Sequence, residues 1–362
     1  MTQRDPDRGA RAARARTTRV REGIGLFAMD ERGLLEVRGS DRIRWLDGMI
    51  TGDVKALEKR GTGAGCHALL LTHRGAIVAD LHVAFMGETL LLECPKHDVD
   101  RIRTALEKRI IADDVTLGDV SEKYCVIGIE GVRSGEVVAR ALAGAVLPSA
   151  DGWAEASVAG AAVLIAAFGW SGEQAYQLRT TPETAVGLRA ALESAAASLG
   201  VDCVVGDRTL LEVLRIEAGI PALGAELDED VLPPEARLER AVAVNKGCYV
   251  GQEIVARLRS RGQVNHLLVG LRLEGAALPA VGSAVSAAGK ATGEVTSVAD
   301  SPSAGPIALA YVRREHAEVG TRVELATGGS AWIVALPFVH TTPPPVAGTV
   351  AVARDGLDSS SS

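Results

Sequence analysis

The stretch from Lys246 to Arg257, KGCYVGQEIVAR, gathers a thiol, two glycines and several polar side chains into one short segment. Gly247 and Gly251 leave room for a positive φ or for a close backbone contact, so we expect a constrained loop that presents side chains. Cys248 follows Lys246 by two residues, and a lysine that points at the sulfur favours the thiolate. A lone cysteine in a tight turn is otherwise most often a buried structural residue. The pattern alone leaves both interpretations open.

The composition is that of an ordinary soluble globular protein, with 47% hydrophobic and 23% charged residues in 362. This length suits two or three domains. Aromatic residues make up only 3%, which argues against a surface of stacked bases. The formal net charge is −7, and an acidic body argues against a broad phosphate-binding face. We therefore expect no direct contact with nucleic acid.

The arginine-rich start of the chain, residues 1–22, is predicted to be a disordered tail, with a transit peptide or a nucleic-acid arm as alternatives. No apolar run approaches the roughly 18 residues that a membrane span needs, and no signal peptide is visible, so we expect no membrane contact. An odd number of scattered cysteines fits a reducing compartment, and we interpret the protein as cytoplasmic. The five are Cys66, Cys94, Cys125, Cys203 and Cys248.

Hydrophobic periodicity predicts an α+β protein. Segments with strand character alternate with amphipathic helices up to about residue 219, where Gly219 is expected to end a helix capped by Asp207. Beyond residue 262, short alternating strands with glycine and proline turns predict a small antiparallel barrel or sandwich. From residue 341 the chain is predicted to be disordered. The expected strands are 34–37, 67–71, 76–85, 89–94, 124–130, 163–168 and 174–179, and the expected helices are 40–48, 99–110, 131–147, 181–199 and 207–219.

Two apparent motifs fail on inspection. Residues 282–292 imitate a phosphate loop, but Ala284 and Ala291 replace the required glycine and hydroxyl. The spacing of Cys66, His67, His73 and His82 matches no common zinc pattern, so we predict no metal site.

The KGCYVGQE stretch, residues 246–253, resembles the signature of the YgfZ branch of the YgfZ/GcvT folate-binding family. The resemblance runs from about residue 25 to about residue 338. It implies a GcvT-like folate-binding module of two subdomains over residues 23–258, made of mixed antiparallel sheets and helices, followed by a C-terminal β-barrel at 262–340. Three other stretches carry it: Gly75–Val83 (GAIVADLHV), Gly169–Leu178 (GWSGEQAYQL) and Leu214–Asp228 (LRIEAGIPALGAELD).

The sequence departs from the aminomethyltransferase branch of that family where charge would be needed. Of two adjacent aspartates in that branch, the first is Ala79 here and only Asp80 remains. A glutamate that would bind the pterin is Gln177, a neutral amide, and a folate-contacting arginine is Leu211. These losses, together with KGCYVGQE, favour the YgfZ branch.

That resemblance implies a folate-binding accessory protein for iron–sulfur cluster assembly or repair, including tRNA-modifying iron–sulfur enzymes, with iron–sulfur client proteins as partners. It leaves open whether any reaction is catalysed. Tetrahydrofolate or a derivative is the implied cofactor, contacted by Glu173, Tyr176, Gln177 and Arg215. Cys248 is the implied functional thiol, in a loop shaped by Lys246, Gly247, Tyr249, Gly251, Gln252, Glu253 and Arg257.

Two alternatives remain. The first is a tetrahydrofolate-dependent aminomethyltransferase or demethylase, in which Asp80 acts as the carboxylate and Cys248 is not needed. The second is a scaffold that keeps folate only as a relic. For Glu253 and Arg257, a local ion pair at i, i+4 is as plausible as a functional role.

Overall fold

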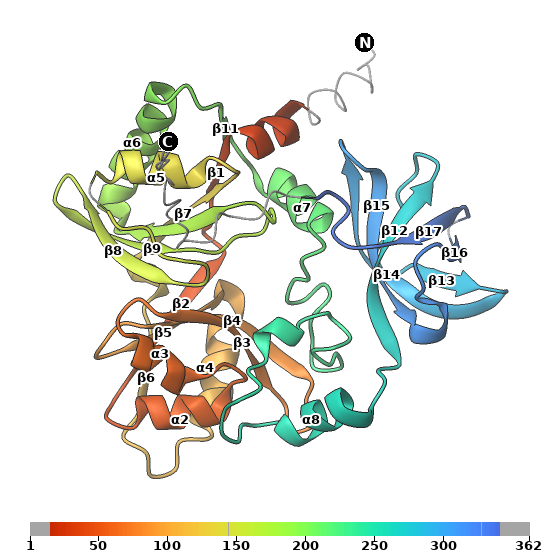
Figure 1. Cartoon of the computed structure of the whole chain (residues 1–362), viewed down its shortest axis with the longest axis horizontal. Coiled ribbons are helices and arrows are strands. Elements are labelled where there is room, and N and C mark those ends of the chain that lie inside the picture. Colours follow the sequence, from red (N-terminus) through yellow and green to blue (C-terminus); the bar gives the residue numbers. More distant parts are fainter. Residues whose placement is uncertain (1–14, 144, 327, 341–362) are drawn as a thin grey trace, which may run out of the picture.

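Two β-sheets and a β-barrel form three lobes around the helix α7 and the long segment that follows it (Figure 1). The computed structural model describes residues 15–143, 145–326 and 328–340. The predicted disorder of 1–14 and 341–362 lies outside the described residues. The α+β architecture with a C-terminal barrel is confirmed.

The first lobe is a five-stranded antiparallel sheet in the order β3-β4-β5-β2-β6. Its strands are β2 (Arg32–Arg38), β3 (Gly65–Leu71), β4 (Ile77–Phe85), β5 (Leu90–Pro95) and β6 (Thr116–Asp119), and its helices are α2 (Arg42–Met49), α3 (Val54–Arg60) and α4 (Val99–Glu107). Because successive side chains of a strand alternate between faces, β4 turns Ala79 and Leu81 into the core beneath the helices. Asp80 and His82 lie on the opposite face.

The second lobe is a six-stranded sheet in the order β11-β1-β7-β10-β9-β8, antiparallel except for β1 and β11. Its strands are β1 (Ile24–Ala28), β7 (Cys125–Glu130), β8 (Trp153–Val158), β9 (Ala161–Ala166), β10 (Ala175–Thr180) and β11 (Cys203–Val205), and its helices are α5 (Ser134–Ala141) and α6 (Pro182–Ser198). These helices cover one face. The other face meets the first sheet through Leu34 and Ala84 on one side and Trp153 and Phe168 on the other.

Helix α7 (Arg208–Glu217) lies beside the barrel. As predicted, Asp207 caps it by accepting a hydrogen bond from the backbone N–H of Leu210, and Gly219 with φ +66° follows its end. The segment after α7 reaches α8 (Gln252–Arg261) and then the barrel. Short 3₁₀ helices occur at Lys96–Asp98, Ser121–Lys123, Glu239–Ala241 and Arg314–His316.

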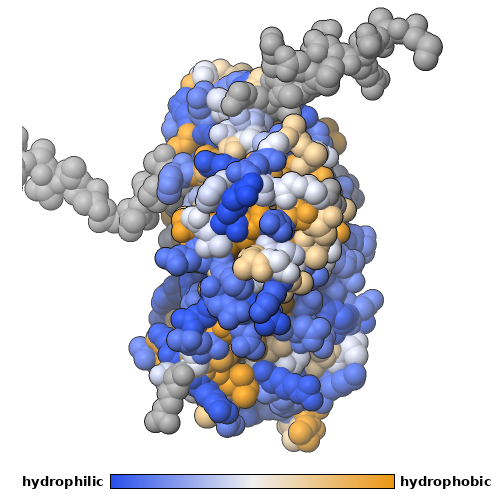
Figure 2. Space-filling model, turned by 90° about the vertical axis from the view of Figure 1, so that its right-hand side faces the viewer, coloured by the Kyte–Doolittle hydropathy of each residue, from blue (hydrophilic) through white to orange (hydrophobic). Residues whose placement is uncertain are grey.

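The barrel closes in the order β12-β15-β14-β13-β16-β17. Its strands are β12 (His266–Glu274), β13 (Ala284–Ala287), β14 (Lys290–Ser301), β15 (Gly305–Arg313), β16 (Arg322–Leu325) and β17 (Ser330–Val334). On the side seen in Figure 2, hydrophobic side chains form several separate groups among hydrophilic ones. Across the described residues, no helix is both long and apolar enough to cross a membrane.

The prediction that residues 15–22 belong to a disordered tail is wrong. These residues are helical, and Val20 is fully buried in a cluster with Leu214 of α7. Arg16 and Arg19 form ion pairs with Asp207 and Asp202. The arginines that suggested a solvated tail therefore attach this helix to the second lobe.

Candidate functional site

A cavity of about 140 Å³ lies where the two sheets meet α7. Three stretches far apart in the sequence meet there: β4 contributes Asp80, the β9–β10 loop contributes Trp170, and α7 contributes Arg215. The complete lining is Met29, Glu31, Arg32, Asp80, Pro95, His97, Trp170, Arg208, Leu211, Glu212, Arg215, Pro221, Ala222 and Leu223.

Asp80 is the carboxylate that β4 directs to this cavity. The Nε2 atom of His67, on the neighbouring strand β3, contacts its Oδ1 atom. Burial alone raises the pKa of Asp80, but the charge and hydrogen bond of His67, with His82 and Arg32 nearby, outweigh burial and hold that pKa below its usual range. Asp80 is therefore ionised at neutral pH. Asp80 lines the cavity while Ala79 faces the opposite core, because successive side chains of β4 alternate between faces.

Charged residues that the sequence analysis did not identify support one wall of the cavity. Arg32 donates two hydrogen bonds to Glu93, at 2.5 and 2.8 Å, and its guanidinium lies 4.9 Å from the centroid of the Trp170 ring. Glu93 is fully buried and also lies 3.3 Å from Arg179. Burial lowers the pKa of Arg179 to about 10. Arg32 begins β2 and Glu93 lies in the mainly apolar β5, 61 residues further along the chain, so no local sequence motif reveals the pair.

Gln177 carries two buried polar atoms that lack a partner. Its side chain is fully buried, and neither the amide oxygen nor the amide nitrogen has a hydrogen bond within the described structure. A Cβ atom added to Gly128 would lie 3.0 Å from Met29 Cγ and 3.4 Å from Gln177 Nε2. Gly128 therefore leaves space for both side chains. Gln177 thus lies near Met29, which lines the cavity, although Gln177 itself is not part of the described lining. Its amide retains unused hydrogen-bonding capacity.

Arg215, expected to contact folate, lines the cavity but is already saturated. It donates to Glu212, to Glu226 at 3.0 Å, to the carbonyl of Ile220 and to Ser297 of the barrel. Its side chain is 4% exposed. Arg215 is consequently a link between α7 and the barrel.

Two other expected folate contacts lie elsewhere. Tyr176 points into the core under α5 and α6, because it alternates with Gln177 along β10. Glu173 forms an ion pair with Arg21 at 3.0 Å, and its side chain is 6% exposed. Neither residue is part of the described cavity lining. For both, the structure corrects the assignment to the cofactor site.

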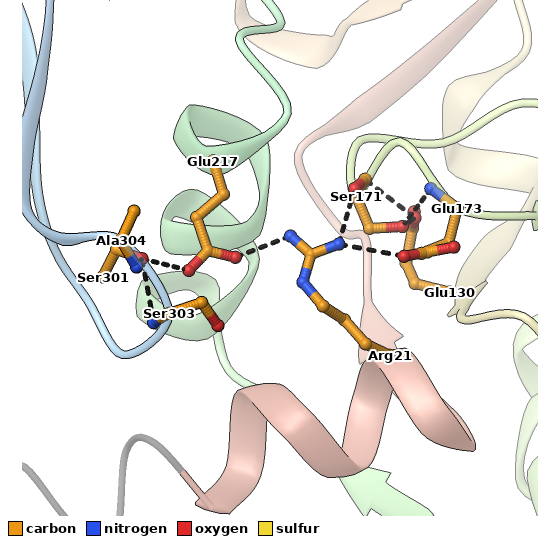
Figure 3. Close-up of polar contacts among 8 residues, drawn as sticks. All are labelled: Arg21, Glu130, Ser171, Glu173, Glu217, Ser301, Ser303 and Ala304. Carbon is orange, nitrogen blue, oxygen red and sulfur yellow. Dashed lines mark hydrogen bonds and ion pairs between the residues drawn. The ribbon is translucent and has the colours of Figure 1, made fainter. Parts of the chain in front are cut away.

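The loop that carries Trp170 is fixed by a buried polar cluster (Figure 3). Glu130 accepts hydrogen bonds from the backbone N–H of Trp170 and from both the N–H and the hydroxyl of Ser171. Burial raises the pKa of Glu130 to about 7 despite these bonds. Arg21 then joins Glu173 to Glu217 of α7, which accepts a hydrogen bond from Ser301 of the barrel. This cluster ties the N-terminal helix, the Trp170 loop and the barrel together.

The signature loop is anchored more strongly than the sequence indicates. Lys246 donates three hydrogen bonds, to the carbonyls of Asp47, Ile50 and Gly52, and its side chain is 1% exposed. The three ammonium donors are therefore used at the end of α2 rather than directed at the Cys248 thiol. This arrangement corrects the expectation that Lys246 activates the cysteine.

Other residues of the loop serve packing. Tyr249 is buried in a cluster with Leu71 and Val255. Gly251 has φ +83°, and a Cβ atom there would lie 2.6 Å from the carbonyl oxygen of Thr72. The expected constraint is confirmed at Gly251.

Gly247 shows no such constraint, since a Cβ atom there would meet only Asp47 Oδ2, at 4.0 Å. Within the described part of the chain, no ion pair joins Glu253 to Arg257 and neither residue reaches the cavity lining, nor does Gln252. Gln252, Glu253 and Arg257 lie on α8.

Cys248 is the one free cysteine that is exposed among the five, all of which are described. Burial raises the pKa of Cys66 and of Cys94 to about 12, so those thiols stay protonated. Cys248 does not belong to the described lining of the Asp80 cavity. The structure thus separates the two residues that the sequence proposed as chemically active.

Comparison with known families identifies both halves of the chain. Residues 7–246 match the GCVT N-terminal domain, and residues 267–340 match the glycine cleavage T-protein C-terminal barrel domain. Most of the KGCYVGQE stretch falls between the two matched ranges.

Curated relatives of similar length agree. An aminomethyltransferase of Saccharopolyspora erythraea is 32% identical over 328 residues, covering 88% of each chain. An aminomethyltransferase of Streptomyces coelicolor is 33% identical over 331 residues, covering 88% of this chain and 87% of the relative. The solved structure of glycine cleavage system aminomethyltransferase T from Bartonella henselae has a TM-score of 0.78 at 23% identity, covers 90% of this chain and 89% of its own, and supports the fold.

These relatives overturn the prediction of an iron–sulfur accessory protein with iron–sulfur clients. They are aminomethyltransferases, which supports the wider family of the sequence-based assignment and not the YgfZ branch. The misleading signal was KGCYVGQE, whose lysine, tyrosine and second glycine are explained by packing.

Proposed function

Because the chain belongs to the glycine cleavage T-protein family, we propose that it is a tetrahydrofolate-dependent aminomethyltransferase whose reaction takes place at the Asp80 cavity. The observation that carries this proposal is an ionised carboxylate and an aromatic wall on one cavity, with an unpartnered buried amide near Met29 of that lining. Asp80, Trp170 and Gln177 supply these three features.

The residues present fit a folate. A pterin ring is flat, heteroaromatic and rich in donors and acceptors, and such ligands bind between apolar and aromatic side chains with a few placed polar groups. Met29, Leu211 and Trp170 provide the apolar wall. Gln177 provides one donor group and one acceptor, both unused. Exposed Arg208 at the cavity is suited to a ligand carboxylate.

Tetrahydrofolate supplies two nitrogens that take up the methylene carbon of a donor X–CH₂–NH₂. The remainder of the donor is released as X–H and ammonia. The carboxylate of Asp80 attracts the proton of the donor's ammonium or of a ligand nitrogen. Trp170, held by Glu130 and Arg32, closes one wall and limits the entry of water. The contribution of this chain is to bind and orient the ligand and to accept a proton at Asp80.

Anaerobic calorimetry and a transfer assay test the proposal. In the reverse direction, the chain is mixed with methylenetetrahydrofolate, ammonia and dithiothreitol as a small thiol, and release of tetrahydrofolate is followed. We expect ammonia-dependent release that is lost in Asp80→Asn and kept in Cys248→Ala. Binding of tetrahydrofolate without transfer by the wild-type chain would contradict the enzymatic proposal, and absence of binding would contradict the site itself.

A further inference from the structure

His67 and Asp80 form a side-chain pair on adjacent strands, directly beside the cavity. In the β3–β4 register His67 is opposite His82 and Leu69 is opposite Asp80, so His67 and Asp80 are diagonal neighbours on one face. The His67 side chain is 12% exposed and that of Asp80 24%. Asp80 lines the cavity, and His67 is not part of the described lining.

His82 holds the His67 ring in place. Its ring stacks on Phe168 with a centroid distance of 3.6 Å and on His67 at 5.0 Å. Burial, followed by the charge of His67, lowers the pKa of His82 well below its usual range, so His82 is neutral at neutral pH. A neutral stacked ring supports His67 without competing for its proton.

The charges around the pair favour an ion pair. Burial lowers the pKa of His67, but Asp80 and then Asp151 outweigh burial and Arg240, and the net pKa is raised. On the other sides Arg32, Arg179 and Glu93 face this region from β2, β10 and β5. These charges favour the protonated form of His67 beside an ionised Asp80.

Only one oxygen of the Asp80 carboxylate is used by this pair. His67 contacts Oδ1, and within the described structure no hydrogen bond is formed by Oδ2. A carboxylate fixed through one oxygen presents the other in a defined direction. Because Asp80 lines the cavity, that direction is open to a ligand.

We infer that His67 is a positioning residue, which keeps Asp80 ionised and fixes its carboxylate so that Oδ2 faces the ligand in the cavity. This inference rests on the proposed function. His67 itself does not touch the ligand. It stabilises the carboxylate electrostatically, and Asp80 exchanges the proton with the donor ammonium or a ligand nitrogen.

The test compares His67→Gln with Asp80→Asn, and with His316→Gln in the barrel as a matched control. Asp80→Asn is expected to lower the transfer rate about 10²–10⁴-fold, the usual contribution of a general acid or base. Glutamine keeps an N–H for Asp80 but carries no charge, so the pKa of Asp80 rises in His67→Gln. The acid limb of the pH–rate profile is therefore expected to move to higher pH, while His316→Gln leaves it unchanged.

A second readout does not depend on turnover. Imidazole NMR follows the titration of His67 in the wild-type chain and in Asp80→Asn, where loss of the carboxylate charge is expected to lower its pKa. If the wild-type chain binds tetrahydrofolate without transferring a methylene group, the proposed function fails, and the His67 inference is decided by this titration and by the pH dependence of tetrahydrofolate binding. An acid limb that stays in place in His67→Gln, or a His67 titration unchanged in Asp80→Asn, would overturn the inference.

Discussion

The loop around Cys248 and the cavity around Asp80 use their polar side chains in opposite ways. In the loop, Lys246 donates its three hydrogen bonds to backbone carbonyls, and Tyr249 packs in a hydrophobic cluster. Cys248 is exposed. Among the described residues, Asp80 in the cavity lining keeps one oxygen without a hydrogen bond, and Gln177, near Met29 of that lining, keeps its whole amide without one. The candidate ligand site is therefore indicated by buried polar groups that lack hydrogen-bond partners. A high density of polar residues in the sequence does not indicate it.

The largest expected effect on stability belongs to the cavity rim. Arg215→Met would leave Glu226, which is fully buried, without its charge partner. Breaking one side of a buried pair costs about 3–5 kcal/mol in the free energy of unfolding. Urea denaturation measures it, with Arg189→Met as the control, since Arg189 and Glu193 form an exposed pair on α6. A loss no larger than that of the control would show that Arg215 is not a structural link.

The next effect concerns the pH dependence of the Trp170 loop. Glu130 has a folded-state pKa of about 7, raised by burial from an ordinary 4.5. A raised carboxyl pKa means that the folded state binds more protons, so stability from this group is present at low pH and is lost as pH rises from about 4.5 to 7. The linked change is about 3 kcal/mol.

Glu130→Gln removes this titration. We expect the free energy of unfolding of the variant to fall less than that of the wild-type chain between pH 4.5 and 7, as measured by urea denaturation at several pH values. Parallel curves for the two proteins would show that Glu130 is ionised throughout.

A smaller effect is expected at the signature loop. Lys246→Met leaves three carbonyls near the end of α2 without their donor, and we expect a loss of about 2 kcal/mol. Because this site lies outside the cavity, the affinity of the folded protein for tetrahydrofolate should stay within about threefold, as calorimetry would measure. A strong loss of tetrahydrofolate affinity in a fully folded variant would show that the Lys246 loop contributes to ligand binding, which contradicts the separation of the loop from the cavity.

The smallest expected effect is that of Cys248→Ala. The side chain is exposed, so the free energy of unfolding should change by less than about 0.5 kcal/mol. Transfer activity should equal that of the wild-type chain. Activity abolished with unchanged stability would restore a working role for this thiol.

The α+β fold, the barrel and most strands of the first two lobes could be predicted from periodicity and turn residues. Asp80 was identified because a resemblance marked its position. Arg32 and Glu130 could not be identified, since their partners Glu93 and Trp170 are distant in sequence. His67 could not be identified because its contact with Asp80 depends on the register of β3 and β4. The N-terminal helix was missed because its arginines look solvated until Asp202, Asp207 and Glu217 are placed beside them.

The central claim is that the folate site is the cavity and not the cysteine loop. A crystal structure of the chain with tetrahydrofolate tests it most directly. We predict ligand density between Met29 and Trp170, with the pterin within hydrogen-bonding distance of the Gln177 amide and Asp80 beside the reactive nitrogens. Ligand density at the Cys248 loop, or a pterin that leaves Gln177 unpaired, would contradict the account.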